Sequence, residues 1–332
     1  MTEISIVTPM YNEYETLDLY FERLIPILEG VTPSYEVICV DDGSSDGTLE
    51  RLRVHHRRNP NIKIVSLSRN FGKEAALTSG LDYASGRAVI PVDADLQDPP
   101  EILPEMIQKW REGAQVVLAR RGSRTEDTVM KRFSAHWFYR LFSRVAETAI
   151  PENVGDFRLM DRAVVNALGQ LPERSRFMKG LFAWVGFRTV EVVYAREARA
   201  AGETKFNYWK LWNFAIDGLL SFSTLPLKIW TYLGFALSAY AGVYLIYLLT
   251  KTMIYGADVP GYASTLSVVL FFNGIILLGM GVMGEYIARL FIEVKRRPLY
   301  LVNEVDGFPT SDIAPMRQQR HETLEPNKIA QS

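Results

Sequence analysis

The sequence predicts an α/β fold, a mostly parallel sheet with helices on both faces, followed by two helices that span a membrane. Three observations support this prediction. Short apolar runs alternate with amphipathic stretches over residues 1–120, as in strands joined by crossover helices. Polar residues cluster where several of the apolar runs end. Two long runs without charge, residues 229–250 and 262–284, lie in the last third of the chain.

The strands and helices follow one another regularly along the first part of the chain. The strand candidates are the apolar runs Ile4–Thr8, Glu36–Val40, Ile62–Leu67, Ala88–Val92 and Gln115–Ala119. The helix candidates are the amphipathic stretches Glu15–Leu28, Thr48–Arg57, Lys73–Ala84 and Glu101–Trp110. Ligands bind such sheets at the carboxyl ends of the strands, so the polar clusters at those ends are the first place to look for a site.

The fourth strand ends in two carboxylates. Residues 89–100 read V-I-P-V-D-A-D-L-Q-D-P-P, so Asp93 and Asp95 follow a buried strand at once and point at one small volume. Carboxylate oxygens suit Mg²⁺ or Mn²⁺, which takes further ligands from substrate phosphate and water, and Gln97 can add a neutral oxygen. An isolated D-x-D is more often an acidic surface turn, so the neighbouring strand ends decide its meaning.

Three other strand ends carry polar residues. Residues 9–13 read P-M-Y-N-E after the first strand, and residues 41–48 read D-D-G-S-S-D-G-T after the second. Together with Asp93 and Asp95 they predict a pocket for a base, a ribose and a metal-bound diphosphate. Arg69 and Lys73 follow the third strand, where two readings stay open: they face phosphate, or they solvate a loop.

Composition excludes several other classes of protein. The formal net charge of -1 predicts no nucleic-acid partner, and a single cysteine, Cys39, allows no disulfide within the chain. The four histidines and Cys39 show no zinc spacing, and no P-loop is present. The glycines at 279, 281 and 284 match G-x-G-x-x-G inside an apolar helical run, which favours helix packing over dinucleotide binding. The N-terminal M-T-E-I-S-I-V shows no signal peptide.

Residues 120–160 carry a cationic patch and a further carboxylate. The cations are Arg120, Arg121, Arg124, Lys131 and Arg132. They form either a solvated basic face or a cradle for an anionic acceptor near a membrane. Asp156 lies between a glycine and an aromatic residue, which alone indicates little.

The C-terminal part predicts a membrane anchor. Residues 201–228 are rich in Trp, Tyr and Lys, which favours helices in the membrane interface. Residues 229–291 hold two charge-free runs that are long enough to span. Basic residues flank the pair on both sides, which places both ends of the chain in the cytoplasm. We therefore expect a cytoplasmic α/β domain over 1–200, a cytoplasmic tail over 292–332, and little order from residue 303 onward.

The ordered set of motifs resembles glycosyltransferase family 2 enzymes of GT-A fold. It is most similar to the polyisoprenyl-phosphate glycosyltransferases, among them the bactoprenol glucosyltransferases of bacteria, and more distantly to dolichol-phosphate mannose synthase. The matching pieces are V-T-P-M-Y-N-E, V-D-D-G-S-S-D-G-T, S-R-N-F-G-K-E-A-A-L, D-A-D-L-Q-D-P-P-E, V-G-D-F-R-L-M-D and A-G-E-T-K-F-N-Y-W-K-L, which precedes the two spans.

The resemblance implies a reaction and a set of partners. A hexose moves with inversion from a nucleotide diphosphate to the phosphate of a membrane polyprenol such as undecaprenyl phosphate. Glucose from UDP-glucose is the first choice, while GDP-mannose and UDP-aminoarabinose derivatives stay open as donors. Mg²⁺ or Mn²⁺ is the implied cofactor. The implied setting is a multi-pass protein of the bacterial inner membrane with its catalytic domain in the cytoplasm, assembled as a homo-oligomer that we expect to be a tetramer.

The resemblance also assigns roles to individual residues. The nucleotide site comprises Pro9, Tyr11, Glu13 and Asp42, with Asp93 near the ribose or metal; Asp95 and Gln97 hold the metal; Arg121 and Arg132 hold the acceptor phosphate; and Asp156 is the catalytic aspartate. A phosphate monoester has a second pKa of about 6 and is mostly ionised at neutral pH, so a general base has little proton to remove. We therefore expect Asp156 to orient the acceptor or the sugar hydroxyls.

Two competing readings remain at this stage. A processive polysaccharide synthase of the same fold would carry a Q-x-x-R-W motif before its spans, and this chain has none. A membrane scaffold that kept the fold without catalysis is the other reading. The carboxylates Asp93, Asp95 and Asp156 argue against it, together with Gln97.

Overall fold

The computed structural model describes residues 2–122, 154–171, 173, 178–194, 225–255 and 261–309. The elements, in chain order, are β1 (Ile4–Met10), α1 (Leu17–Val31), β2 (Tyr35–Asp41), α2 (Thr48–Arg58), β3 (Ile62–Leu67), α3 (Lys73–Tyr83), β4 (Ala88–Pro91), the 3₁₀ turn η1 (Pro100–Ile102), α4 (Leu103–Arg111), β5 (Val116–Arg121), β6 (Val154–Asp161), α6 (Arg162–Gln170), α7 (Met178–Trp184), β7 (Thr189–Tyr194), α9 (Leu225–Tyr255), α10 (Tyr262–Val294) and β8 (Val302–Asp306). Every strand and helix expected in the first 120 residues is present, with ends that differ by a few residues.

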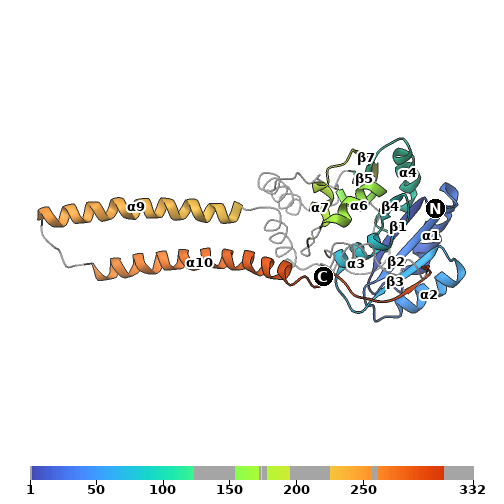
Figure 1. Cartoon of the computed structure of the whole chain (residues 1–332), viewed down its shortest axis with the longest axis horizontal. Coiled ribbons are helices and arrows are strands. Elements are labelled where there is room, and N and C mark those ends of the chain that lie inside the picture. Colours follow the sequence, from blue (N-terminus) through green and yellow to red (C-terminus); the bar gives the residue numbers. More distant parts are fainter. Residues whose placement is uncertain are drawn as a thin grey trace, which may run out of the picture.

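The strands of the described residues form one sheet in the order β7-β5-β6-β4-β1-β2-β3-β8 (Figure 1). Its centre, from β4 through β1 and β2 to β3, is parallel as predicted. The flanks differ from the prediction, because β6 runs antiparallel to β4 and β5, and β8 runs antiparallel to β3. The sheet is therefore mixed, but it is still mostly parallel as predicted: β7 runs parallel to β5, and among the described strands only β6 and β8 run against the others. The apolar pattern of a strand does not encode the direction of its partner.

Helices cover both faces of the sheet, as predicted. One apolar core joins α1, α2 and α4 to the sheet through residues such as Leu24, Leu52 and Met106. A second core on the other face joins α3, α6 and α7 through Leu77, Val165 and Leu181. A sheet buried on both faces explains why β2 reads as a continuous run of buried residues.

Helix α3 lies unusually close to the sheet. A Cβ added at Gly80 would lie 2.2 Å from Cγ1 of Val7 on β1 and 3.1 Å from Cγ2 of Val40 on β2. Any larger residue at Gly80 would therefore push the helix away from the strands. This contact holds α3, whose first residue is Lys73, close against β1 and β2.

Two long helices extend away from the sheet and run side by side (Figure 1). At a rise of about 1.5 Å per residue, α9 and α10 are each about 45–50 Å long, longer than a bilayer core of about 30 Å. Within the part of the chain that the structure describes, one helical segment, Phe271–Val294, has both the length and the apolar composition of a membrane span. The second predicted span is not confirmed by this criterion.

The G-x-G-x-x-G of the sequence lies inside α10, so it does not follow a strand as a dinucleotide fingerprint does. Gly279 faces α9, because a Cβ added there would lie 3.2 Å from the indole of Trp230. A Cβ at Gly281 or Gly284 would meet nothing within 4 Å. The interpretation as helix packing therefore holds for Gly279 alone.

The segment after α10 returns to the sheet, which corrects the expectation of little order from residue 303 onward. Residues Val302–Asp306 form β8 and pair with β3 at one edge of the sheet. Arg53 on α2 forms ion pairs with Glu304 and Asp306, and the Tyr300 hydroxyl donates to Asp82 Oδ2 at 2.9 Å. The strand escaped prediction because most of its residues are polar and its partner, β3, is distant in the sequence.

Some predicted features lie outside the described residues. The interfacial helices were expected over 201–228, of which only the last residues, from Leu225, fall within a described element, α9. The predicted boundaries at 200 and 228 therefore stay predictions. The boundary at 292 also stays a prediction, although β8 shows that part of the expected tail belongs to the sheet.

Candidate active site

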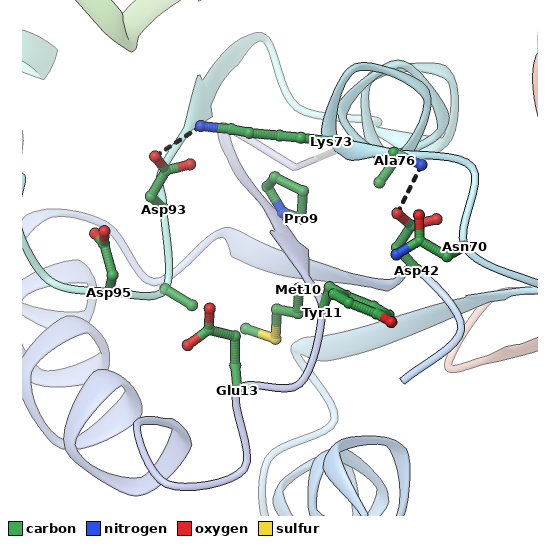
Figure 2. Close-up of a pocket in the computed structure, with 12 residues that line it drawn as sticks. Pro9, Met10, Tyr11, Glu13, Asp42, Asn70, Lys73, Ala76, Asp93 and Asp95 are labelled. Atoms are coloured by element: carbon green, nitrogen blue, oxygen red, sulfur yellow. Dashed lines mark hydrogen bonds and ion pairs between the residues drawn. The ribbon is translucent and has the colours of Figure 1, made fainter. Parts of the chain in front are cut away.

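A cavity of about 320 Å³ opens at the carboxyl ends of β1, β2 and β4 (Figure 2). Its walls include all the residues predicted for the nucleotide, namely Pro9, Tyr11, Glu13, Asp42 and Asp93, together with the predicted metal ligand Asp95. Met10, Asn70, Gly72, Lys73, Ala76 and Ala94 complete the lining. Separate polar clusters of the sequence thus meet at one edge of the sheet, as the rule for parallel strands requires.

The loops after β1 and β2 are bound to each other. The Asn12 backbone N–H donates to Ser44 Oγ at 2.9 Å, and the Ser45 N–H donates to Asn12 Oδ1 at 2.9 Å. Asn12 has a φ of 55°, in the left-handed region that asparagine tolerates better than most residues. These bonds turn the chain sharply after β1, so that both Tyr11 and Glu13 line the cavity.

Asp42 fixes the loop between β3 and α3. Its carboxylate accepts hydrogen bonds from the backbone N–H groups of Phe71 at 2.7 Å and Gly72 at 2.8 Å. Burial raises the pKa of Asp42, and these two bonds oppose the rise. Gly43 lies so close to this loop that a Cβ there would be 2.6 Å from the carbonyl carbon of Arg69. Asp42 therefore holds Asn70 in the cavity wall and sets the start of α3.

The two carboxylates after β4 sit on a tightly bent loop. Leu96 has a φ of 56°, and the Gln97 backbone N–H donates to Asp95 Oδ1 at 3.1 Å. The Tyr194 hydroxyl, at the end of β7, donates to the buried Asp98 carboxylate on the same loop. Asp93 and Asp95 both reach the cavity, whereas Gln97 is absent from its lining. The prediction that Gln97 holds a metal is not tested by this arrangement.

Lys73 links the cavity to Asp156. Its Nζ lies 2.7 Å from Asp93 Oδ2 and 3.1 Å from Asp156 Oδ2, and Figure 2 shows the side chain reaching across the cavity from α3 to Asp93. Burial alone would lower the pKa of Lys73, but the two carboxylates outweigh it and raise that pKa above its ordinary value. Burial raises the pKa of Asp93, and Lys73 opposes the rise.

Asp156 stands on β6 beside a buried arginine. Arg158 donates from Nη2 to the Gly155 carbonyl at 2.8 Å, and its guanidinium lies 4.0 Å from the centre of the Phe182 ring. Burial lowers the pKa of Arg158 to about 10, while Asp156 acts in the opposite direction. Asp156, for which the family resemblance implies a catalytic role, thus lies near two cations and is joined through Lys73 to the cavity.

The two predicted acceptor-phosphate residues are placed only in part. Arg121 is the last residue of β5 and pairs in register with Tyr194 of β7. Arg132 lies outside the described residues. Their proposed roles stay predictions.

The donor set at the cavity fits a hard divalent cation that shares its ligands with a substrate. Within the described residues, no group of three or more His, Cys, Asp and Glu side chains is placed to hold a metal ion. Asp93 and Asp95 nevertheless offer two carboxylates in one cavity. Mg²⁺ commonly uses one or two carboxylates and completes its shell with phosphate oxygens and water, so an incomplete protein shell is what such a cation requires.

Two lining residues with polar side chains, Asn70 and Lys73, were not among the predicted site residues. Asn70 and Lys73 both come from the segment after β3, for which the sequence analysis left open whether the cations face phosphate. The strand-end rule that located Asp93 applies equally to this third strand. What the sequence does not show is that Lys73 reaches carboxylates on two other strands.

Comparison with known proteins places the chain in a family. Residues 5–169 match the glycosyl transferase family 2, and residues 225–290 match the GtrB C-terminal hairpin. An uncharacterised glycosyltransferase of Synechocystis is 57% identical over 92% of this chain and 96% of its own length. A prophage bactoprenol glucosyl transferase homologue of Escherichia coli is 46% identical over 91% of this chain and 99% of its own length.

A viral relative and a solved structure complete the comparison. The bactoprenol glucosyl transferase of Shigella phage SfII is 46% identical over 91% of this chain and 98% of its own length. A Mycobacterium tuberculosis glucosyl-3-phosphoglycerate synthase, solved with Mg²⁺ and UDP, is 22% identical, with a TM-score of 0.49 over 66% of this chain and 79% of that one. The family match and the close relatives agree: this chain is a glycosyltransferase of family 2, and it belongs with the bactoprenol glucosyl transferases.

Proposed function

We propose that the protein transfers glucose with inversion from UDP-glucose to the phosphate of a membrane polyprenol, undecaprenyl phosphate. The observation that carries the proposal is the cavity that joins Asp93, Asp95 and Lys73, with Asp156 attached through Lys73. Its support comes from relatives named bactoprenol glucosyl transferases, which match nine-tenths of this chain. Because the chain belongs to a transferase family, the alternative interpretation as a scaffold without catalysis is excluded.

The chemistry is a single displacement. An oxygen of the acceptor phosphate attacks the anomeric carbon, the bond from that carbon to the diphosphate breaks, and UDP leaves with the electron pair. No proton has to be removed, because the acceptor phosphate is mostly ionised at neutral pH. Asp95 and Gln97 would hold a divalent cation, which would stabilise the charge on the leaving diphosphate.

The residues of the chain bind and orient the reactants. Pro9, Tyr11, Glu13 and Asp42, which line the cavity, would bind the nucleotide, and Asp93, which lines it too, would contact the ribose or the metal. Asp156, whose carboxylate faces the Lys73 ammonium, orients the acceptor or the sugar hydroxyls. Arg121 at the end of β5, with Arg132, receives the acceptor phosphate.

The acceptor requires the reaction to occur at a membrane. In this proposal α9 and α10 both cross the bacterial inner membrane as a hairpin, and the catalytic domain lies in the cytoplasm. Their length, their exposed apolar side chains and the match to the GtrB C-terminal hairpin support this arrangement. A homotetramer is part of the proposal and is testable by native mass spectrometry in detergent.

Transfer from labelled donors tests the proposal. Purified full-length protein with undecaprenyl phosphate and Mg²⁺ or Mn²⁺ should move label from UDP-glucose into organic-extractable lipid. GDP-mannose and a UDP-aminoarabinose derivative are the competing donors, and lipid labelling from one of those alone would overturn the assignment of glucose. The Asp95→Asn variant is the control for the cation site: it preserves shape but loses a charged ligand, and activity close to that of the wild type would refute the metal assignment.

A further inference from the structure

The geometry points to Lys73 as a residue that couples binding of the divalent cation to binding of the donor diphosphate. In the protein without donor, the Lys73 ammonium neutralises Asp93 and Asp156. A cation entering alone meets a positive charge already in place. A diphosphate entering with the cation gives Lys73 a new counter-ion. This inference concerns the same site as the proposed function. It rests on that function in one respect, namely that the donor carries a diphosphate.

The contacts of Lys73 set up the competition. Its Nζ is 2.7 Å from Asp93 Oδ2, and Asp93 and Asp95 line the same cavity. Whether the cation binds Asp93 directly or only lies beside it, an ammonium held at that oxygen opposes the approach of a second positive charge. The repulsion is screened less in the cavity than in open water, because the Asp93 side chain is only 36% exposed.

The position of Lys73 at the start of its helix is unfavourable unless carboxylates balance its charge. Lys73 is the first residue of α3, where the helix dipole disfavours a cation. The two carboxylates offset this cost, since the ammonium bridges Asp93 on the β4 loop to Asp156 on β6. The backbone at this point cannot shift easily, because Asp42 holds Gly72 and Gly80 packs against the strands.

The side chain, in contrast, has room to move. It is 47% exposed, and it lines a cavity rather than a packed core. When a diphosphate enters, Lys73 can exchange one carboxylate for a phosphate oxygen and release Asp93 toward the cation. When each of two ligands removes an obstacle to the binding of the other, the two bind with positive coupling. This coupling is reciprocal, because each ligand raises the affinity for the other by the same factor. The cation and the nucleotide are therefore expected to bind together rather than separately.

The test measures Mn²⁺ binding to full-length protein in detergent, by electron paramagnetic resonance of free Mn²⁺, without and with UDP. In the wild type, UDP should tighten Mn²⁺ binding. In Lys73→Met, Mn²⁺ alone should bind about tenfold more tightly than it does to the wild type, and the effect of UDP should shrink by a similar factor, a size typical of coupled sites. Lys73→Arg keeps the charge and should retain the coupling.

A matched control separates the local contact from a general loss of charge. Arg69→Met removes one positive charge from the same loop, but the Arg69 guanidinium contacts the Asn70 carbonyl and the Phe71 ring, and the site carboxylate on which its charge acts is Asp42 rather than Asp93. Its affinity for Mn²⁺ alone should stay within about twofold of the wild type, since exposed charges are largely screened.

The outcomes discriminate clearly. Unchanged or weaker binding of Mn²⁺ alone by Lys73→Met would overturn the inference, and so would an equal gain of affinity in Arg69→Met. The metal-only measurement needs neither glucose transfer nor a lipid acceptor. If glucose transfer is absent while Lys73→Met still tightens Mn²⁺, the proposed function fails and the role of Lys73 stands.

Discussion

The Asp156 carboxylate lies 3.1 Å from the Lys73 ammonium. Asp156 is on β6, the strand that also carries the buried Arg158. A carboxylate surrounded by cations is suited to orienting polar groups and poorly suited to accepting a proton. The ionised acceptor phosphate removes the need for a base in any case. The structure and the chemistry of the acceptor therefore favour the same role for Asp156.

Asp156→Asn tests that role at the level of one residue. The variant should lose roughly 100-fold in rate, the order of cost of a misplaced reactant, while its pH–rate profile keeps the wild-type shape between about pH 6.5 and 8.5. The measurement is a pair of profiles with saturating metal. A carboxylate-like limb that occurs in the wild type and vanishes in the variant would instead make Asp156 the base.

Glu36 is a buried carboxylate at the opposite end of the sheet from the site. It is 2% exposed, Lys63 Nζ lies 2.6 Å from Oε2, and the Ser85 backbone N–H donates to Oε1 at 2.7 Å. Burial would raise the pKa of Glu36, but Lys63 and Ser5 outweigh burial and lower it below 4.5. A lowered folded-state pKa means that the stabilisation is present above the unfolded pKa and is lost as pH falls through the folded one.

Lys63→Met should accordingly lower the free energy of unfolding by about 3–5 kcal/mol at pH 7, because it leaves a buried charge without its cation. The difference from the wild type should shrink as pH falls below about 4.5, where Glu36 becomes protonated. Unfolding curves at neutral and acid pH measure this. Lys109→Met, which removes an exposed lysine 3.7 Å from Glu112, is the control and should change stability by less than about 1 kcal/mol. A difference that persists unchanged in acid would show that Glu36 is not its source.

At the scale of the element, β8 completes the sheet edge beyond β3. Tyr300, Val302, Val305 and Phe308 all pack against the core on the α3 face. A chain that ends after Arg297 lacks these residues, whereas one that ends after Pro309 keeps them. At about 1 kcal/mol for each partly buried side chain, the shorter chain should lose about 4 kcal/mol and several degrees of thermal stability. Equal melting temperatures for the two chains would show that β8 adds nothing to the domain.

The local sequence pattern predicted most of the helices and strands of the first 120 residues, but it predicted little of how the strands pair. Apolar runs and turn residues located β1 to β5 and α1 to α4, since those signals lie within a few residues of each other. The strand-end rule likewise gathered Tyr11, Asp42, Asp93 and Asp95 at one cavity. The antiparallel strands β6 and β8 escaped prediction, because their place depends on partners distant in the sequence.

The candidate site was likewise predicted only in part: the sequence indicated its residues but not the contacts between them. The bridge from Lys73 to Asp156 joins α3 to β6, and no spacing rule connects two residues so far apart in the chain. The hydroxyl of Tyr194 on the Asp98 carboxylate is another such contact. Sequence patterns thus identify the chemical groups of the site, and only the fold shows which of them touch.

At the scale of the whole molecule, the arrangement of α9 and α10 in a membrane is testable with cysteine labels. The native Cys39 is fully buried, and burial raises the pKa of its thiol, so it should not react. A membrane-impermeant maleimide should label Gly261→Cys, between the two helices, in intact cells. It should label Arg297→Cys, after α10, only once the cells are permeabilised. Labelling of both positions only after permeabilisation would exclude a hairpin that crosses the membrane twice.

The return of the chain to the sheet at β8 also orders events during synthesis. Leu67 pairs with Val302, so the edge of β3 stays open while the ribosome makes the whole segment between them. At roughly 5–20 residues per second, that interval lasts on the order of tens of seconds. The helical hairpin leaves the ribosome before the strand that closes the edge. A nascent chain whose hairpin fails to insert would keep an exposed strand edge, which is a surface that chaperones and proteases recognise.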